Sequence, residues 1–173
     1  MAITRLNHAV LYVRDAEASS AFYSEVLGFR AVMTMPGAVF LQAPDSTNDH
    51  DLGLFSVGAA AGASEAGRAT VGLYHLAWEV DTLDELQRLS GELSRRSALV
   101  GASDHGSTKA LYGRDPDGIE FEVSWLVPAD LLDDETKAAR STIRPLDIAR
   151  EQKRYGGRTR GGVGISSPAP AGA

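Results

Sequence analysis

The sequence LNHAVLYV at residues 6–13 is rich in β-branched and aromatic side chains, which predicts a β-strand. Asp15 follows as a helix cap, and apolar residues then recur every four positions from Ala18 to Val26. Gly28 ends this helix, because glycine adopts the left-handed conformation of a helix C-terminus without strain. The N-terminal part of the chain is therefore predicted to be a strand followed by a helix.

The sequence LYHLAWEV at residues 73–80 starts the same pattern a second time. Thr82 caps the following helix, and Glu85 completes a capping box. The apolar stripe of this helix consists of leucines at helical spacing, Leu83, Leu86, Leu89 and Leu93. A histidine precedes the cap by seven residues in both copies, so the repeat predicts that His8 and His75 are structurally equivalent.

Shorter strand candidates follow each helix. They are residues 31–35, 39–43 and 52–57 in the first half, and residues 110–113 and 119–125 in the second. The pattern predicts an α+β fold made of two β-α-β-β-β modules, at about residues 3–57 and 71–126, joined by the Ala/Gly-rich residues 58–69. We expect the two curved sheets to pair as a half-open, eight-stranded barrel.

The two modules form one predicted domain, residues 1–127, followed by a helical extension, 128–155, and a disordered tail, 156–173. The net charge of −6 is unevenly spread, because eight of the 17 Lys and Arg residues but two of the 23 Asp and Glu residues follow residue 136. The acidic body argues against nucleic-acid binding. The basic residues of the extension are interpreted as a solvated helix face or a subunit contact.

The chain contains no cysteine, which excludes thiolate nucleophiles, zinc–cysteine clusters and iron–sulfur centres. Any metal ion must therefore be held by histidine and carboxylate side chains. No apolar run approaches the roughly 20 residues that cross a bilayer, and the N-terminus lacks the features of a signal peptide. We expect a soluble, cytoplasmic protein.

Strand alternation places His8 on one face with Val10, and His75 on one face with Ala77. If the two sheets pair, both imidazoles can point into one cavity. Glu122 is the candidate third ligand, although Glu120 shares its face of the last strand. Two imidazoles and one carboxylate leave coordination positions open, as in non-haem Fe(II) sites. Taken singly, each of these side chains is also compatible with an ordinary core or surface role.

Two segments, FYSEVLGF at residues 22–29 and DPDGIEFE at residues 115–122, resemble the vicinal oxygen chelate superfamily. That superfamily includes glyoxalase I, antibiotic-resistance proteins and type I extradiol dioxygenases. The resemblance covers about residues 3–127 and implies the paired-module barrel. The step from DPDG to the family's ligand glutamate selects Glu122 over Glu120.

The remaining histidines resemble those of one branch, the extradiol dioxygenases. The segment HDLGLF at residues 50–55 is similar to the one whose histidine, here His50, lies beside the metal as an acid–base residue. The segment DHGSTKALY at residues 104–112 is similar to one that supplies a histidine and a tyrosine near the substrate, here His105 and Tyr112. The small polar residues at Ser107 and Thr108 depart from that pattern and leave its register open.

The resemblance implies an Fe(II)-dependent enzyme, with Mn(II) as the alternative metal, that cleaves a catechol-like ring beside its vicinal diol and incorporates both atoms of O2. His8, His75 and Glu122 would hold the metal, and His50, His105 and Tyr112 would act on the substrate. Expected partners are a small aromatic diol, O2 and a second copy of the chain as a homodimer. Candidate pocket walls are Tyr12, Trp78, Trp125 and the segment beyond residue 127.

Two alternatives within the same superfamily remain open. A glyoxalase-type isomerase would need a fourth ligand, a glutamate on the last strand of the first module. The sequence contains no glutamate between Glu25 and Glu65, and Gly53 occupies about that position. A metal-free, antibiotic-binding resistance protein would not need the full set of two histidines and one glutamate.

Overall fold

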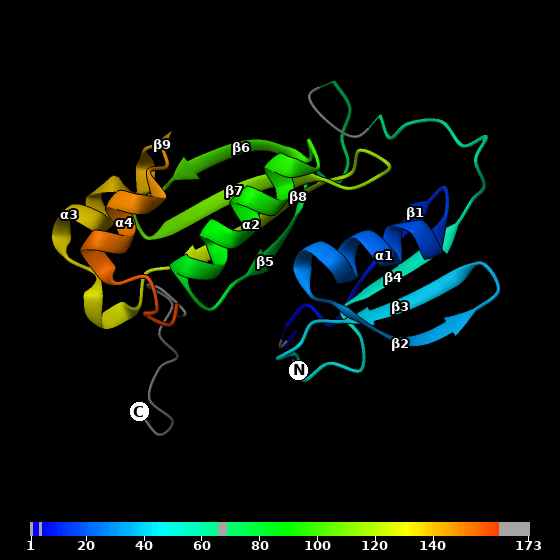
Figure 1. Ribbon diagram of the computed structural model, residues 1–173, viewed down its shortest axis with the longest axis horizontal. Helices are drawn as coiled ribbons and strands as arrows, with labels where there is room; N and C mark the ends of the chain where they lie inside the picture. Colours follow the sequence, from blue (N-terminus) through cyan, green and yellow to red (C-terminus); the bar gives the residue numbers. More distant parts are fainter. Residues whose placement is uncertain (1, 4, 66–68, 163–173) are drawn as a thin grey trace. The chain divides into compact units, whose positions relative to one another are not determined.

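The chain forms two compact units in the computed structural model, which describes residues 2–3, 5–65 and 69–162 (Figure 1). Unit 1 contains the described residues up to Gly72 together with the turn Asp115–Ile119. Unit 2 contains Leu73–Arg114 and the described residues from Glu120 onward. Each unit is an α+β module built on one mixed sheet.

Unit 1 has the predicted β-α-β-β-β order. Its elements are β1 (Ala9–Val13), α1 (Ala16–Leu27), β2 (Arg30–Met35), β3 (Ala38–Gln42) and β4 (Leu52–Ser56). The strand order is β1-β4-β3-β2, and β1 and β4 are parallel while the other pairs are antiparallel. Asp15 caps α1 by accepting two backbone N–H groups, and Gly28 ends the helix at a φ of 78°.

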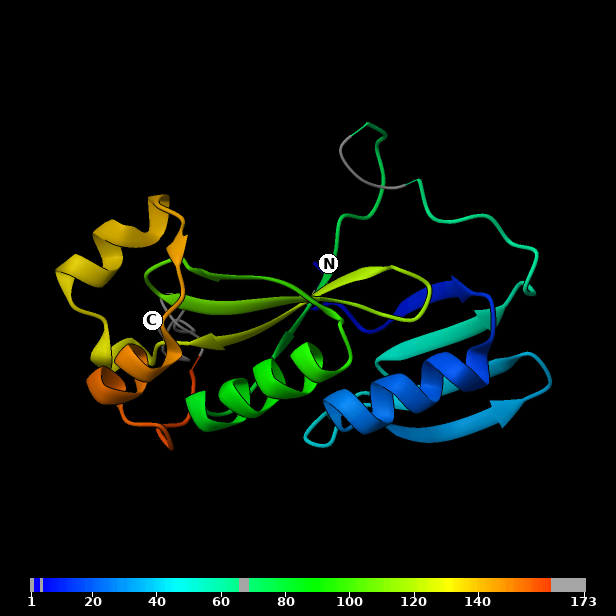
Figure 2. The same cartoon turned by 45° about the horizontal axis from the view of Figure 1, so that its top comes forward.

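Unit 2 repeats this topology (Figure 2). Its elements are β5 (Leu76–Glu79), α2 (Leu83–Arg95), β6 (Leu99–Asp104), β7 (Thr108–Arg114) and β8 (Glu120–Leu126). The strand β5 is parallel to β8, and the remaining pairs are antiparallel. Thr82 accepts the Glu85 N–H at 3.2 Å, and the predicted leucine stripe of α2 is fully buried. The carboxylate of Glu85 binds Arg88 instead of closing the predicted capping box.

The α+β class and the internal repeat are confirmed, while two strands lie where the sequence predicts none, β6 and, in the predicted helical extension, β9 (Arg144–Pro145). The sequence of β6, LVGASD, contains a glycine and lacks regular alternation. The ladder between β6 and β7 also shifts register between Leu99 and Gly101. A shift occurs at the equivalent place in unit 1, between Ala31 and Met33 of β2. The bulge is thus part of the repeated design.

The C-terminal extension, defined here as residues 128–162, packs within unit 2. It contains two single-turn helices, η1 (Ala129–Leu131) and η2 (Ala139–Ser141), with α3 (Asp134–Ala138), β9 (Arg144–Pro145) and α4 (Ile148–Tyr155). The strand β9 extends the sheet by pairing with β6. In the described part of the chain, no helix has the length and apolar character needed to cross a membrane.

The segment predicted to be disordered, 156–173, starts with residues that are held by hydrogen bonds. The Gly161 N–H donates to the Asp81 carbonyl at 2.6 Å, and the Trp125 indole N–H donates to the Thr159 carbonyl at 3.2 Å. Backbone groups of this segment therefore form hydrogen bonds to the rest of unit 2, which the amino-acid composition does not predict. Residues 163–173 lie outside the described residues.

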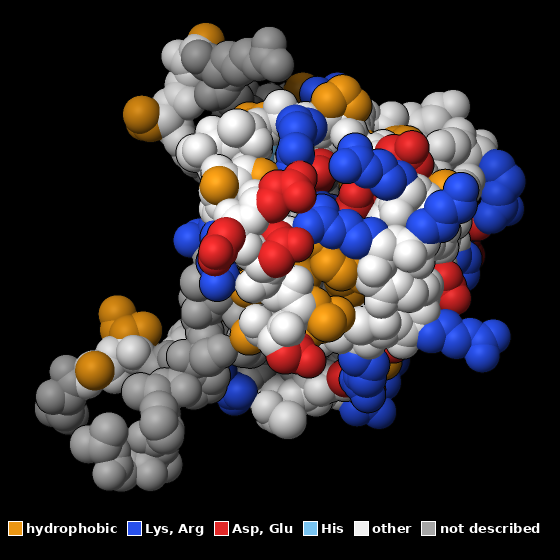
Figure 3. All heavy atoms as spheres, turned by 90° about the vertical axis from the view of Figure 1, so that its left-hand side faces the viewer, with side chains coloured by type: hydrophobic (Ala, Val, Ile, Leu, Met, Phe, Trp, Pro, Cys, Tyr) orange, Lys and Arg blue, Asp and Glu red, His pale blue; other side chains and the backbone are white. Residues whose placement is uncertain are grey.

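Some basic residues of the extension form ion pairs with carboxylates, and Figure 3 shows Lys and Arg side chains interspersed with Asp and Glu on this side. Arg154 contacts the Asp133 carboxylate at 2.8 Å, and Asp133 also caps α3 by accepting the Thr136 N–H at 2.7 Å. The bonds from Thr136 and Arg154 lower the pKa of Asp133 to about 2.

The turn Asp115–Ile119 is the first part of the motif DPDGIEFE, and it contacts the motif FYSEVLGF through Tyr23. Tyr23 donates its hydroxyl to Asp115 at 3.2 Å, and Arg14 pairs with Asp117 at 2.6 Å. Burial raises the pKa of Tyr23 well above its usual value, and the Asp115 charge adds to this effect. Burial also raises the pKa of Asp115, although hydrogen bonds from Ile119, Asp117 and Tyr23 partly offset it. The turn is therefore fixed to unit 1 by buried polar groups.

Replacing Tyr23 with phenylalanine should destabilise the protein by about 1–3 kcal/mol, because it leaves a buried Asp115 oxygen without its donor. Urea denaturation at pH 7 measures the change. The matched control is Tyr12→Phe, since the Tyr12 side chain is exposed on β1. Equal unfolding midpoints for Tyr23→Phe and wild type would show that the Tyr23–Asp115 hydrogen bond does not stabilise the fold.

Replacing Asp133 with alanine should lower the urea midpoint at neutral pH. A pKa that is lower in the folded state stabilises that state fully above the unfolded value of about 3.9, and this contribution is lost as the pH falls toward 2. The difference from wild type should therefore shrink between pH 5 and pH 2. Asp134→Ala, whose carboxylate is fully exposed, should behave like wild type at both pH values.

Candidate functional site

The predicted ligands occupy equivalent places in the two units. His8 directly precedes β1 and His75 directly precedes β5. The register then pairs Ala77 with Glu122 in unit 2, just as it pairs Val10 with Gly53 in unit 1. Position 53 is therefore the structural counterpart of Glu122.

Unit 2 brings His75 and Glu122 together. The His75 Nε2 atom lies 3.1 Å from the Glu122 Oε2 atom. The His75 Nδ1 atom is buried without a hydrogen-bond partner, so Nε2 is the ring nitrogen that faces the carboxylate. Glu120, by contrast, points to Arg114, with 3.7 Å between the charged atoms. The two glutamates of β8 thus have different surroundings.

The geometry of this pair fits a metal ion. Two ligand atoms at about 2.1 Å from an ion and at right angles to each other are about 3 Å apart. The 3.1 Å separation of the His75 nitrogen and the Glu122 oxygen matches this spacing. Imidazole and carboxylate are also a donor set that Fe(II) and Mn(II) accept.

A polar cluster lies beside this pair in unit 2. Tyr112 is the cross-strand neighbour of Glu122, and its ring lies 5.7 Å from the His75 ring. Its hydroxyl lies 3.2 Å from the His105 Nε2 atom. Ser103 contacts both groups, with its hydroxyl 2.8 Å from His105 and 3.2 Å from Tyr112.

Ser103 was missed by the sequence analysis. Its strand, β6, was not predicted, and without that strand the two-residue spacing to His105 carries no signal. The structure also gives the register of the segment around Ser107 and Thr108, because β7 begins at Thr108 and the His105 N–H donates to the Thr108 carbonyl at 2.9 Å. His105 and Tyr112 therefore face each other across this hairpin.

Unit 1 brings His8 and His50 together. Their ring centroids are 4.5 Å apart, and Phe40 packs edge-on against His50 at 5.0 Å. The His8 Nδ1 atom lies 2.7 Å from the Asn7 side-chain oxygen, so this contact occupies Nδ1 and leaves Nε2 as the ring nitrogen that could face a metal. His50 lies 3.0 Å from the exposed Asp49 carboxylate.

Asp51 fixes the loop that carries His50. Its carboxylate accepts the Ala43 N–H at 2.8 Å and bonds to Ser46 and Asn48 at 2.7 Å. Burial alone would raise the pKa of Asp51, but these hydrogen bonds outweigh it and lower the pKa below its usual value. Asp51 thus stays ionised and acts as a structural anchor for the loop.

The predicted site residues are divided between the two units. Within the described ranges, no three His, Asp or Glu side chains form a cluster that could hold a metal. His8 belongs to unit 1, whereas His75 and Glu122 belong to unit 2. A cavity of about 270 Å³ in unit 1 is lined by Tyr12, Arg14 and Asp117 but by none of the predicted ligands. Trp125 is not a pocket wall, because its side chain is fully buried.

The chain is similar to two curated proteins. The chain is 35% identical over 122 residues to biphenyl-2,3-diol 1,2-dioxygenase 3 of Rhodococcus globerulus, covering 69% of this chain and 62% of the relative. It is 28% identical over 120 residues to catechol-2,3-dioxygenase of Bacillus subtilis (strain 168), covering 69% and 41%. The chain thus spans less than two thirds of the length of either curated relative.

Solved structures share the fold. A glyoxylase/bleomycin resistance protein/dioxygenase domain from Frankia sp. EAN1pec superposes with a TM-score of 0.59 at 21% identity, covering 71% of this chain and 92% of that one. A family model also matches residues 5–123, which include both modules and all the candidate site residues. On this evidence the chain belongs to the Glyoxalase/Bleomycin resistance protein/Dioxygenase superfamily.

Proposed function

We propose that this protein is a metal-dependent extradiol dioxygenase that cleaves a catechol-like aromatic diol. The observation that carries the proposal is the His75–Glu122 pair at 3.1 Å, next to the cluster of Tyr112, His105 and Ser103. Such a pair could bind a metal that a diol chelates, and the neighbouring hydroxyl and imidazole groups could form hydrogen bonds with that diol. The names of the two curated relatives, both diol dioxygenases, support the same reading.

His75, Glu122 and His8 would hold Fe(II), or Mn(II) in its place. When bound, the metal would lower the pKa of a coordinated hydroxyl and allow electron transfer between the ring and O2. The orientation of His8 is preset, because Asn7 holds its Nδ1 atom and leaves Nε2 for the metal. Two histidines and a carboxylate leave coordination positions for the diol and O2.

His50 is the proposed general base that takes a proton from the diol and returns it later in the reaction. An imidazole ring can take up a proton on one nitrogen and release it again, as a general acid–base group must. The 4.5 Å contact with His8 places His50 beside a proposed ligand. Tyr112 and His105 would hydrogen-bond the substrate oxygens.

Gly53 distinguishes this proposal from a glyoxalase-type isomerase. Glu122 has its counterpart at this position, where unit 1 offers no carboxylate for a fourth ligand. Phe40 occupies the counterpart of Tyr112, since it pairs with Gly53 as Tyr112 pairs with Glu122. Unit 1 therefore supplies aromatic surface where an isomerase would need its second proton-transfer group.

The experiment that tests the proposal is anaerobic reconstitution of the protein with Fe(II), followed by catechol or its 3- and 4-substituted derivatives and then air. We expect oxygen uptake in step with a yellow ring-opened product. Absence of oxygen uptake with every diol would refute the proposal. Turnover of a thiol hemiacetal with Ni(II) or Zn(II) would favour the isomerase, and tight drug binding by metal-free protein would favour a resistance protein.

Replacing Glu122 with glutamine should weaken Fe(II) binding by at least about 100-fold, because even residues that only support a ligand contribute about 10- to 100-fold. Glu120→Gln is the matched control, since Glu120 lies on the same strand and faces Arg114. Anaerobic Fe(II) titration measures both affinities. Equal affinities for the two variants would remove Glu122 from the ligand set.

Replacing His50 with alanine should leave Fe(II) affinity unchanged and lower kcat by about 10²- to 10⁴-fold, the range of general acid–base catalysis. Asp49→Asn tests whether the carboxylate next to His50 contributes, and we expect a change of less than about threefold because the Asp49 side chain is exposed to solvent. Loss of iron from His50→Ala would instead identify His50 as a ligand.

A further inference from the structure

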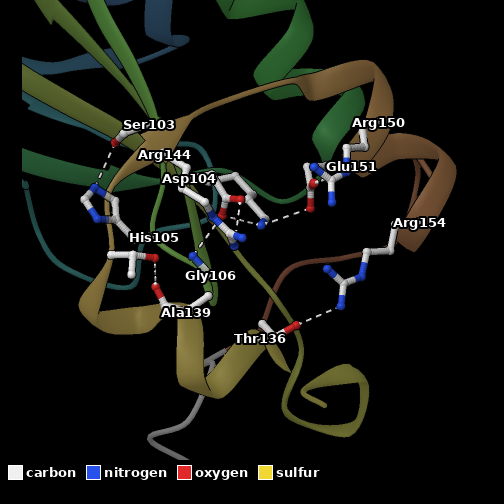
Figure 4. A network of polar contacts seen from close by, with 12 residues as sticks. Ser103, Asp104, His105, Gly106, Thr136, Ala139, Arg144, Arg150, Glu151 and Arg154 are labelled. Carbon is white, nitrogen blue, oxygen red and sulfur yellow. Dashed lines mark hydrogen bonds and ion pairs between the residues drawn. The ribbon is translucent and has the colours of Figure 1, made fainter. Parts of the chain in front are cut away.

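A buried lysine connects the C-terminal extension to the hairpin that carries His105. The side chain of Lys109, on β7, is 1% exposed. Its Nζ atom lies 2.6 Å from the Asp104 Oδ1 atom on β6 and 2.9 Å from the Glu151 Oε2 atom on α4. Figure 4 labels these two carboxylates, Asp104 and Glu151, within the network of polar contacts. The Glu151 side chain is 4% exposed, and its contact with Lys109 is an ion pair rather than a well-directed hydrogen bond.

Such a charge is costly to bury, and removing one partner of a buried pair leaves an uncompensated ion. Two carboxylates compensate the buried charge of Lys109, and the extension supplies one of them, Glu151. It also contributes Arg144, on β9, which lies 3.4 Å from the second oxygen of Asp104. Asp104 is thus held by one cation from its own hairpin and one from the extension.

Asp104 in turn shapes the turn that contains His105. Its Oδ1 atom accepts the Gly106 N–H at 2.8 Å, and Gly106 adopts a φ of +74°. A Cβ atom at Gly106 would lie 2.5 Å from the Thr136 carbonyl oxygen and 3.0 Å from the Ala139 Cβ atom. The turn is therefore closed against the extension by contact as well as by charge.

We propose that the C-terminal extension, through Glu151, Lys109 and Asp104, positions His105 against Ser103 and Tyr112 in the candidate site. This inference rests on the proposed function for its catalytic meaning. Its structural part concerns only the hydrogen bonds of the His105 ring at 2.8 Å and 3.2 Å. Glu151, Lys109 and Asp104 are positioning residues, since they act through His105.

The structural part is tested by NMR of the histidine ring nitrogens in the full chain as purified, without added iron. The sequence has four histidines, and a His105→Asn variant identifies the His105 signals by their absence. Glu151→Ala should shift the His105 Nε2 signal and leave those of His8 and His50 in place. Lys153→Ala is the matched control, because Lys153 lies on the same helix with an exposed side chain.

The activity part uses catechol and O2 with the iron-loaded protein. Glu151→Ala should lower kcat by about tenfold at unchanged iron content, in line with residues that support a functional group indirectly. Glu151→Gln should lower the rate to a similar extent, because it keeps the size of the side chain but removes the charge that pairs with Lys109. If wild-type protein consumes no oxygen, the proposed function fails, while the NMR result still decides the structural part.

A double variant, Lys109→Met with Glu151→Leu, covers the case in which Glu151→Ala does not fold. It removes the charges but keeps the buried volume, a change that folded proteins often tolerate. The same shift of the His105 signal is expected. Folded Glu151→Ala or double-variant protein with wild-type His105 signals would overturn the inference, and so would a loss of rate that follows a loss of iron.

Discussion

The parallel pairing of the first and last strands in each unit is the constraint on which the candidate site depends. Parallel neighbours need a long crossover, and here the crossover consists of a helix and a two-stranded meander. This closure brings residue 122, at the end of the module, next to His75 at its start. The ladder between β5 and β8 thus accounts for the contact between the two candidate ligands of unit 2.

Equivalent positions of the two modules carry different side chains. Gly53 and Phe40 stand in unit 1 where Glu122 and Tyr112 stand in unit 2. A Cβ atom at Gly53 would make only ordinary contacts, the nearest at 3.4 Å to Val10, so space alone does not require glycine there. The absence of a carboxylate at this position therefore bears on the chemistry of the site rather than on packing.

Much of the fold could be predicted because its signals are local. Asp15 and Thr82 cap their helices as side chains that accept backbone N–H groups, and Gly28 ends α1 in the left-handed region. These features depend on a few neighbouring residues. The strand β6 has no comparable local signal, because its stability comes from pairing with β7 and with β9, more than 40 residues further along the chain.

The candidate site shows the same limit more sharply. The sequence motifs name His75, Glu122, His105 and Tyr112 as candidates, and the structure contains the contacts of His75 with Glu122 and of His105 with Tyr112. Ser103 can be recognised as their neighbour only once the strand β6 is known.

The basic extension was interpreted as a solvated face or a subunit contact, and Lys153 is indeed exposed, yet its neighbour Glu151 is buried against Lys109. The net charge of a segment does not distinguish its individual residues, so it cannot identify Glu151 as the carboxylate that pairs with Lys109. A buried ion pair contributes little net stability compared with apolar residues of the same volume, and what it specifies is one geometry. In this protein the geometry specified is that of the turn before β7, the turn that carries His105.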